Sequence, residues 1–208
     1  MRTLVKGTKK EDIKAAGKVL QSGGIVAFPT DTVYGLGAVY DDAGAVKKIF
    51  AAKGREEKKP LSILVSDSSQ VTLLAALAGG EMEQKAKRLM EKYWPGALTL
   101  IFPKKPGIPD AVTAGGDTIG IRMPDLDVAR QLIRAAGKPL AAPSANTSGK
   151  RSASSAQEVL EDLDGKIDMV IDGGACRIGV ASTVVDMTGE RPVILREDVI
   201  TAAMIEEA

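Results

Sequence analysis

Several residue types are absent or scarce in this chain of 208 residues, and each absence excludes a kind of chemistry. The sequence has no histidine and a single cysteine, Cys176. Without histidine it cannot contain a Ser/His/Asp or Cys/His nucleophile, and almost every kind of zinc site is excluded as well. One cysteine cannot form a disulfide within the chain, which is typical of a protein in a reducing compartment.

Aromatic residues and net charge are also low. Aromatic residues make up 3% of the sequence, so we expect a core built from aliphatic side chains and methionine. The 28 Lys and Arg residues nearly balance the 27 Asp and Glu residues. A protein that coats nucleic acid depends on an excess of cations that neutralise phosphates, so this balance argues against that class. A local basic pocket is compatible with it.

Long apolar segments are missing too. No apolar run approaches the roughly 20 residues that cross a bilayer, and the polar residues 1–10 do not have the pattern of a signal peptide. We therefore expect a cytoplasmic protein without membrane contact. An apolar share of 44% suits one globular domain, which we predict to span residues 1–208.

The sequence does contain an alternation of helix-like and strand-like segments. Thr8 and Glu11 have the spacing of a helix capping box, and Ser155 and Glu158 repeat it. Apolar runs predict strands at 25–28, 61–65, 97–102, 118–123, 139–142, 169–171, 182–186 and 193–195. We expect an α/β fold in which helices flank a twisted sheet and loops at the strand ends carry the site.

The familiar phosphate-binding motifs are incomplete. Gly149-Lys150 is followed by Arg151 and lacks the upstream glycine of a Walker motif. Gly35-Leu36-Gly37 lacks the third glycine of a dinucleotide-binding fingerprint. A bound nucleotide must therefore be held in another way.

Four polar clusters are candidates for a site. Residues 29–37 place two hydroxyls and a carboxylate after a buried strand, a pattern that a capped turn shares. Residues 53–60 carry cations that either bind phosphates or only complement a helix dipole. Residues 143–152 offer many small donors for an anion, or form a flexible serine-rich loop. Arg122 interrupts an apolar strand and needs a carboxylate partner, either an aspartate of the chain or a bound amino acid.

Taken in order, these clusters resemble the YrdC-like family of threonylcarbamoyl-adenylate synthases. The resemblance covers about residues 13–196, and its most specific parts are residues 29–37, 53–55, 59–61, 94–96, 122–124, 143–146 and 182–183. It implies a twisted mixed α/β sheet with a deep, positively charged concave face. It also implies a nucleotidyltransferase that makes threonylcarbamoyl-AMP and pyrophosphate from L-threonine, bicarbonate and ATP, for modification of tRNA next to the anticodon.

The resemblance assigns roles to single residues. The residues at the family's ATP-binding positions are Lys53, Arg55, Lys59, Thr118, Ser144, Asn146, Ser152 and Arg196, of which Lys53 and Arg55 are also expected to be catalytic. The residues at its threonine-binding positions are Thr32, Arg122, Ala142 and Ser182. Magnesium is expected to arrive with ATP, without ligands from protein side chains.

Two features differ from parts of the family. In some relatives the strand after Lys-Pro-Leu supplies a histidine near the threonine, whereas here the matching stretch reads Ser62-Ile63-Leu64-Val65. Longer relatives add a second domain through a linker, and this chain is expected to be the short form.

Two alternative functions stay open for this fold. One is the formation of carbamoyl-adenylate, as in a related module of hydrogenase maturation. The other is an RNA-binding or ribosome-associated module that uses the same basic cavity, against which the scarcity of aromatic residues for base stacking argues. The retained Lys-x-Arg and Ser-x-Asn pairs favour the synthase, whose expected partner is a downstream tRNA threonylcarbamoyl transferase.

Overall fold

The computed structural model describes residues 2–77 and 79–208. Within these residues the strands form one ten-stranded sheet in the order β1-β8-β2-β3-β7-β4-β6-β5-β9-β10. The strands are β1 (Leu4–Lys6), β2 (Val26–Phe28), β3 (Gly35–Val39), β4 (Ser62–Leu64), β5 (Leu98–Pro103), β6 (Thr118–Arg122), β7 (Leu140–Ala141), β8 (Met169–Ile171), β9 (Thr183–Asp186) and β10 (Val193–Arg196). The α/β class and every predicted strand are thus confirmed, whereas β1 and β3 were not predicted.

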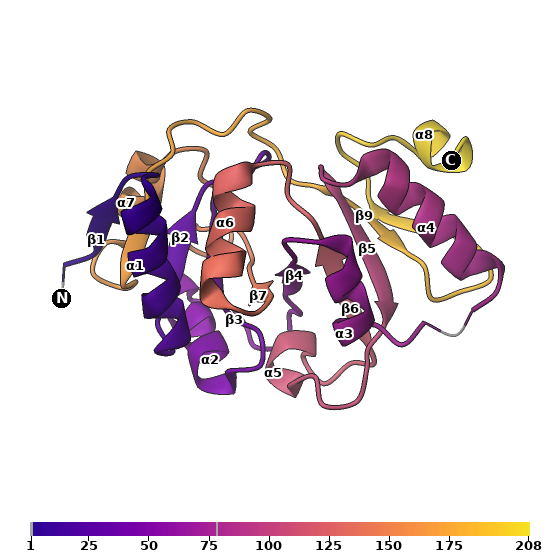
Figure 1. Ribbon diagram of the computed structural model, residues 1–208, viewed down its shortest axis with the longest axis horizontal. Helices are drawn as coiled ribbons and strands as arrows, with labels where there is room; N and C mark the ends of the chain where they lie inside the picture. Colours follow the sequence, from indigo (N-terminus) through magenta and orange to yellow (C-terminus); the bar gives the residue numbers. More distant parts are fainter. Residues whose placement is uncertain (1, 78) are drawn as a thin grey trace.

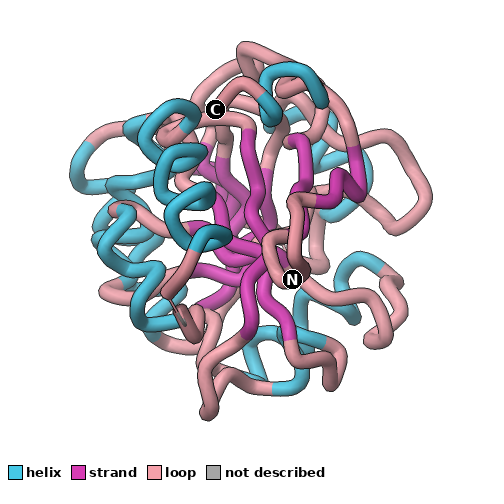
Figure 2. Tube along the Cα trace, turned by 90° about the vertical axis from the view of Figure 1, so that its right-hand side faces the viewer, coloured by secondary structure: helices cyan, strands magenta, loops and turns pink. Residues whose placement is uncertain are grey.

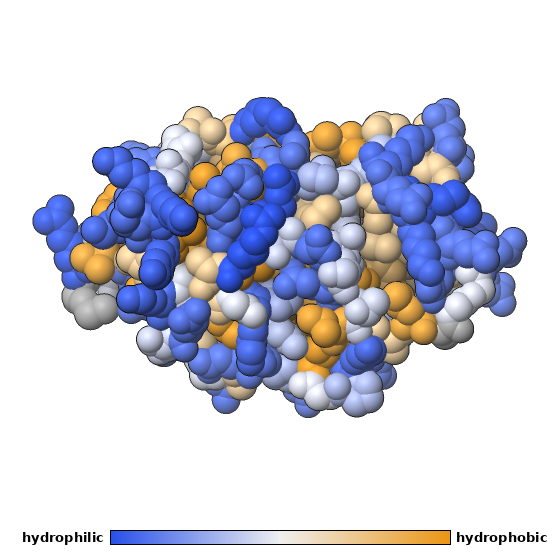
Figure 3. Space-filling model, in the orientation of Figure 1, coloured by the Kyte–Doolittle hydropathy of each residue, from blue (hydrophilic) through white to orange (hydrophobic). Residues whose placement is uncertain are grey.

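Helices connect most of these strands. They are α1 (Lys10–Gln21), α2 (Ala43–Lys53), the 3₁₀ turn η1 (Ser68–Gln70), α3 (Val71–Leu74), α4 (Glu81–Tyr93), α5 (Asp110–Thr113), α6 (Asp127–Ala136), α7 (Ala156–Leu163) and α8 (Ala202–Glu206). None of the helices in the described residues is long and apolar enough to cross a membrane. Hydrophilic side chains (blue) cover the outward faces of α1 and α4 in Figure 3.

The sheet mixes parallel and antiparallel pairs. β1, β8 and β2 run parallel, as do β4 with β6 and β5 with β9, while hairpin-like pairs such as β5 and β6 are antiparallel. Strands far apart in sequence therefore become neighbours. In particular, β9 and β10 extend the sheet next to β5, so that they share a face with β4 and β6. Figure 2 shows the strands (magenta) fanned out by the sheet's twist.

Two helices cover one end of the sheet. α1 and α6 lie side by side in front of β2, β3 and β7 (Figure 1). A Cβ atom added at Gly17 of α1 would come within 2.7 Å of Ala135 Cβ on α6, so only glycine permits this close packing. The apolar faces of both helices bury a core cluster with side chains of β2, β7 and β8, and Leu64 of β4 belongs to the same cluster.

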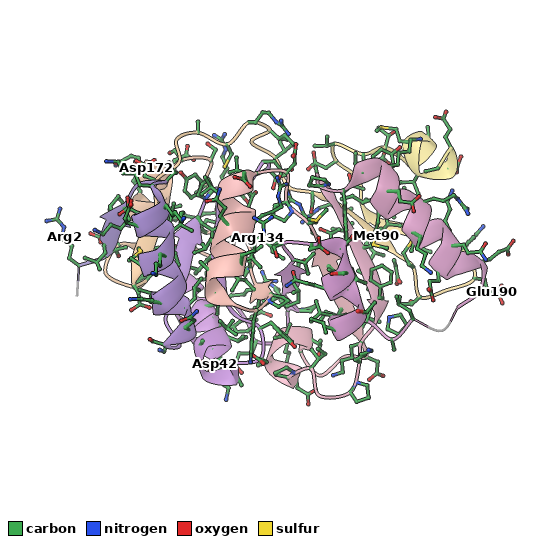
Figure 4. All side chains as sticks on the ribbon, in the orientation of Figure 1. Arg2, Asp42, Met90, Arg134, Asp172 and Glu190 are labelled. Atoms are coloured by element: carbon green, nitrogen blue, oxygen red, sulfur yellow. The ribbon has the colours of Figure 1, made fainter. Side chains whose placement is uncertain are left out.

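The helix starts test the predicted caps. Ser155 caps α7 and accepts a hydrogen bond from Glu158 N at 3.2 Å, as predicted. The capping box at Thr8 is wrong, because α1 begins one residue later, with Lys9 at the N-cap position and no side-chain cap. At α2, Asp42 (labelled in Figure 4) accepts from Ala45 N at 2.9 Å.

Candidate functional site

A cavity of about 250 Å³ opens on one face of the sheet. Strands β4, β6, β5, β9 and β10, which are consecutive in the sheet, form its floor, and residues 30–35 and 142–144 form part of its wall. Eight of the twelve residues predicted from the resemblance line it, namely Thr32, Arg55, Arg122, Ala142, Ser144, Ser152, Ser182 and Arg196. The fold therefore brings most of the predicted site into one place.

The floor of the cavity follows from the strand register. Leu64 of β4 pairs with Arg122 of β6, and Thr99 of β5 pairs with Val184 of β9, which pairs in turn with Arg196 of β10. All five side chains line the cavity, because residues that are paired across a sheet lie on the same face. Two arginines thus stand on one row of the sheet, separated by a hydroxyl and an apolar side chain.

Arg122 is buried, with 6% of its surface exposed, and each of its three guanidinium nitrogens has a partner. Nε donates to Gly96 O at 2.8 Å, Nη1 donates to Thr32 Oγ1 at 2.7 Å, and Nη2 donates to the carboxylate of Asp31. A guanidinium has five N–H groups, so these three bonds leave two that have no acceptor among the described residues. The fixed orientation and the two free donors suit a ligand carboxylate.

The partner that the sequence required for Arg122 is Asp31. This side chain is buried and also accepts from Asp125 N at 3.1 Å. Its second oxygen, Oδ2, is buried without a hydrogen-bond partner in the described part of the chain. Burial lowers the pKa of Arg122, and the negative charge of Asp31 opposes that shift. The pair is nearly neutral as a whole, so it adds little net charge to the cavity.

Residues 30–34 are held by their own hydroxyls and by a second loop. Thr30 Oγ1 donates to Val33 O at 2.6 Å and lies 2.9 Å from Thr32 Oγ1. From residues 172–179, Ile178 N and Gly179 N donate to the carbonyl groups of Asp31 and Thr32. These bonds fix the segment that presents Thr32 to the cavity.

The side chain of Tyr34 also links residues 30–34 to residues 172–179. Its hydroxyl donates to Gly174 O at 2.8 Å and accepts from Gly173 N at 3.2 Å. Burial is the main reason that the pKa of Tyr34 is raised to about 12.

Arg55 is half-buried just after the end of α2. Its Nη2 donates to Pro60 O at 3.0 Å, while its Nε is buried and has no acceptor among the described residues. Burial lowers the pKa of Arg55. A buried donor without an acceptor at the wall of a cavity is a position that an anionic ligand can complete.

Arg196 stands at the β10 end of the cavity floor. Its Nε and Nη2 both donate to Ser182 O, at 2.9 Å and 2.8 Å, which ties β10 to the start of β9. In the described chain neither Arg196 nor Arg55 has a carboxylate within 4 Å. The cavity lining therefore carries two guanidinium charges that no carboxylate of the described chain neutralises.

Lys53 is not among the residues that line the cavity, and its predicted roles in catalysis and ATP binding stay predictions. Its ammonium group donates to Ser144 O and Asn146 O, both at 2.5 Å, and lies 3.4 Å from Asn146 Oδ1. Since its three N–H groups all face the 144–146 loop, Lys53 lies behind the cavity wall and shapes the loop. Burial, with a smaller contribution from the Arg55 charge, lowers the pKa of Lys53 to about 8.

Three more predicted residues lie outside the cavity lining. Asn146 is buried and donates to Thr147 O and Lys150 O, so its amide also builds the loop. Lys59 is exposed and lies 3.3 Å from a carboxylate oxygen of Glu56. Thr118 is exposed at the start of β6, on the same face as Arg122 but four residues before it. Their predicted contacts with ATP stay predictions.

Sequence reasoning assigned no role to several residues of the site. Thr99, Leu64 and Val184 line the cavity, and Asp31 sets the orientation of Arg122. Asp31 was visible as the carboxylate of the 29–37 cluster. The three strand residues had no local signal, because they look like ordinary members of apolar strands.

The lining of the cavity offers hydrogen-bond donors and positive charge that suit an anion. Three guanidinium groups, the hydroxyls of Thr32, Ser144 and Ser182, and no acidic side chain line the cavity within the described residues. Likewise, the described residues contain no group of three or more His, Cys, Asp or Glu side chains that could hold a metal ion.

Comparison with known proteins gives consistent results. The family model Sua5_yciO_yrdC, whose description reads "Telomere recombination", matches residues 18–198. A threonylcarbamoyl-AMP synthase of Bacillus subtilis is 49% identical over 200 residues, which cover 96% of this chain and 57% of the Bacillus protein. A synthase of Pyrococcus abyssi is 48% identical over 88% of this chain and 53% of its own length. The chain thus spans little more than half the length of these curated relatives.

The solved structures agree on the fold. A crystal structure of P. abyssi Sua5 complexed with L-threonine superposes with a TM-score of 0.94 at 44% identity, over 99% of this chain and 60% of that one. A crystal structure of Escherichia coli YciO superposes with a TM-score of 0.82 at 26% identity, over 95% and 96% of the two chains.

Proposed function

The chain belongs to the Sua5/YciO/YrdC family, and on that basis we propose that it forms threonylcarbamoyl-AMP from L-threonine, bicarbonate and ATP. The relatives named as synthases and the relative complexed with L-threonine support this activity. They do not favour the RNA-binding module or the carbamoyl-adenylate reaction. The reaction is an adenylyl transfer, so the enzyme class is a nucleotidyltransferase.

The observation that carries the proposal is that one cavity combines a neutralised arginine with two arginines that have no acidic partner. Arg122 is neutralised by Asp31 and keeps two N–H groups without an acceptor among the described residues, which suits the carboxylate of a zwitterionic amino acid. Arg55 and Arg196, elsewhere on the lining, have no acidic partner within 4 Å in the described chain, which suits a triphosphate. One cavity therefore offers positions for both substrates.

The chemical steps need alignment more than a protein base. The deprotonated amine of threonine attacks bicarbonate or carbon dioxide and forms an N-carboxylate. With bicarbonate, water leaves; with carbon dioxide, the amine releases one proton to solvent. A carboxylate oxygen then attacks the α-phosphorus of ATP, a P–O bond forms, and pyrophosphate leaves as the bond to the β-phosphate breaks. Because the nucleophile is already an anion, the absence of histidine is compatible with the reaction.

The residues that line the cavity divide this work. We assign Arg122, Thr32, Ser182 and the backbone at Ala142 to threonine, and Arg55, Ser144, Ser152 and Arg196 to the phosphates. Lys53 and Asn146 hold the loop that presents Ser144. Magnesium bound to the phosphate oxygens would supply further positive charge to the leaving pyrophosphate.

The product is a mixed anhydride that another enzyme has to use. We propose that the threonylcarbamoyl group passes to tRNA through a separate threonylcarbamoyl transferase in the cytoplasm.

The decisive experiment measures pyrophosphate release by the purified chain. Release should require ATP, L-threonine and bicarbonate together, and mass spectrometry should find threonylcarbamoyl-AMP. Pyrophosphate release without threonine, or RNA binding without turnover, would contradict the proposal.

A further inference from the structure

The row of side chains across the cavity floor places two different groups beside Arg122. Leu64 pairs with Arg122 from β4, on one side. The pairing of Leu100 with Ile121 puts Thr99 next to Arg122 from β5, on the other side. Since neighbouring strands lie about 4.8 Å apart, an amino acid held by Arg122 is within reach of both flanks.

The first flank is apolar. Leu64 is 4% exposed, lines the cavity, and packs against the core cluster that contains Leu140 and Ala142. A leucine held in this way offers a fixed methyl surface and no hydrogen-bonding group. Leu64 belongs to the stretch 62–65, which the resemblance matches to the strand that supplies a histidine in some relatives.

The second flank carries a hydroxyl pair. Thr99 Oγ1 lies 2.8 Å from Ser182 Oγ, and both side chains are buried and line the cavity. One hydroxyl donates to the other, and among the described residues the second proton has no acceptor, whichever group is the donor. The pair can therefore donate one hydrogen bond to a ligand oxygen.

We infer that Leu64 and the Thr99–Ser182 pair together select the side chain of the amino-acid substrate. This inference rests on the proposed function. With the α-carboxylate on Arg122, the two substituents of Cβ face opposite flanks: the methyl group contacts Leu64 and the hydroxyl binds Thr99 and Ser182. Leu64 and Thr99 are thereby specificity-determining residues of the threonine pocket.

The arrangement predicts how related amino acids behave. Serine lacks the methyl group and loses its contact with Leu64, a loss that is typically about 10- to 200-fold in kcat/KM. Valine replaces the hydroxyl by a methyl group and leaves the hydroxyl pair without its acceptor. L-allo-threonine exchanges the positions of the methyl group and the hydroxyl. It loses both favourable contacts at once, so its kcat/KM should be lower than that of serine or of valine.

The test compares ratios of kcat/KM for pyrophosphate release with threonine, serine and valine. Leu64→Ala should lower the threonine-to-serine ratio by about 10-fold and change the threonine-to-valine ratio little. Thr99→Val should lower the threonine-to-valine ratio by about 10-fold or more, and Thr99→Ser should keep it. Ratios are independent of the fraction of active protein.

Matched controls separate this role from packing. Leu64→Val and Ile63→Val each remove one methylene group from the same strand, but Ile63 points into the opposite core cluster and does not line the cavity. Only Leu64→Val should shift the threonine-to-serine ratio, and it serves as the test if Leu64→Ala does not fold. If the wild-type chain releases pyrophosphate with threonine and these ratios do not move, the inference is wrong. If no amino acid supports release, the proposed function itself is wrong.

Discussion

The carboxylate of Asp31 and the guanidinium of Arg122 form a buried ion pair between a loop at the end of β2 and the last residue of β6. Both side chains are almost fully enclosed, and the remaining bonds of Arg122 go to Thr32 and Gly96. The pair thus joins two motifs that lie 91 residues apart in the sequence. It also sets the direction in which Arg122 can meet a ligand.

Replacing Arg122 alone should destabilise the protein as well as weaken threonine binding. Arg122→Ala leaves the charge of Asp31 buried without a partner, which typically costs about 3–5 kcal/mol of unfolding free energy. Urea unfolding should show this loss, and the double variant Asp31→Asn/Arg122→Gln should recover part of it. Calorimetry on whichever of these variants folds should find threonine binding weakened, and unchanged affinity would contradict the assigned role.

Arg55 should matter for turnover far more than for stability. Removing one fixed donor to developing charge typically costs about 100- to 1000-fold in rate. Arg55→Ala should lose threonine-dependent pyrophosphate release by that order. Its thermal unfolding should change little, because within the described residues Arg55 makes one side-chain hydrogen bond, to Pro60 O. Lys58→Ala, in the same exposed loop, is the matched control and should keep wild-type turnover.

Lys53 should give the folding stability a dependence on pH. Its pKa is about 8 in the folded chain, below the ordinary value of 10.5. Between these values the unfolded chain binds the proton more tightly than the folded chain, so the Lys53 contribution to stability should rise from pH 8 to pH 10. The difference in unfolding free energy between the wild type and Lys53→Met, measured over this range, should show that rise. A flat difference would contradict the burial of a charged Lys53.

Tyr34 should show the opposite trend at higher pH. Its pKa is raised to about 12 from the ordinary value of 10, so the unfolded chain loses the proton first and stability should fall between pH 10 and pH 12. An ultraviolet titration should find a late-ionising tyrosine that disappears in Tyr34→Phe, whereas Tyr40, whose pKa burial also raises, should still ionise late in that variant. That variant should also lose about 1–3 kcal/mol, because Gly173 N and Gly174 O lose their partner.

Much of the site could be predicted because its motifs are local. The 29–37 and 143–146 clusters follow strands directly, and a strand end fixes where the next few side chains stand. Arg122 could be recognised from sequence as a charge within an apolar strand. Of its two expected carboxylate partners, an aspartate of the chain or a bound amino acid, the structure shows the aspartate, Asp31. Lys53 was harder, because the same lysine in sequence can face a ligand or a backbone carbonyl, and only the path of the 144–146 loop decides between them.

The sequence by itself determined the alternation of helices and strands, the positions along the chain of eight of the ten strands in the described sheet, and the residue types that suit an anion. These properties depend on periodicity, capping and composition, which act over a few neighbouring residues. Tertiary structure alone decided that Leu64, Arg122, Thr99, Val184 and Arg196 share one row, because that row requires the register of five strands drawn from distant parts of the chain. Such register comes from long-range pairing and twist, which no local pattern encodes.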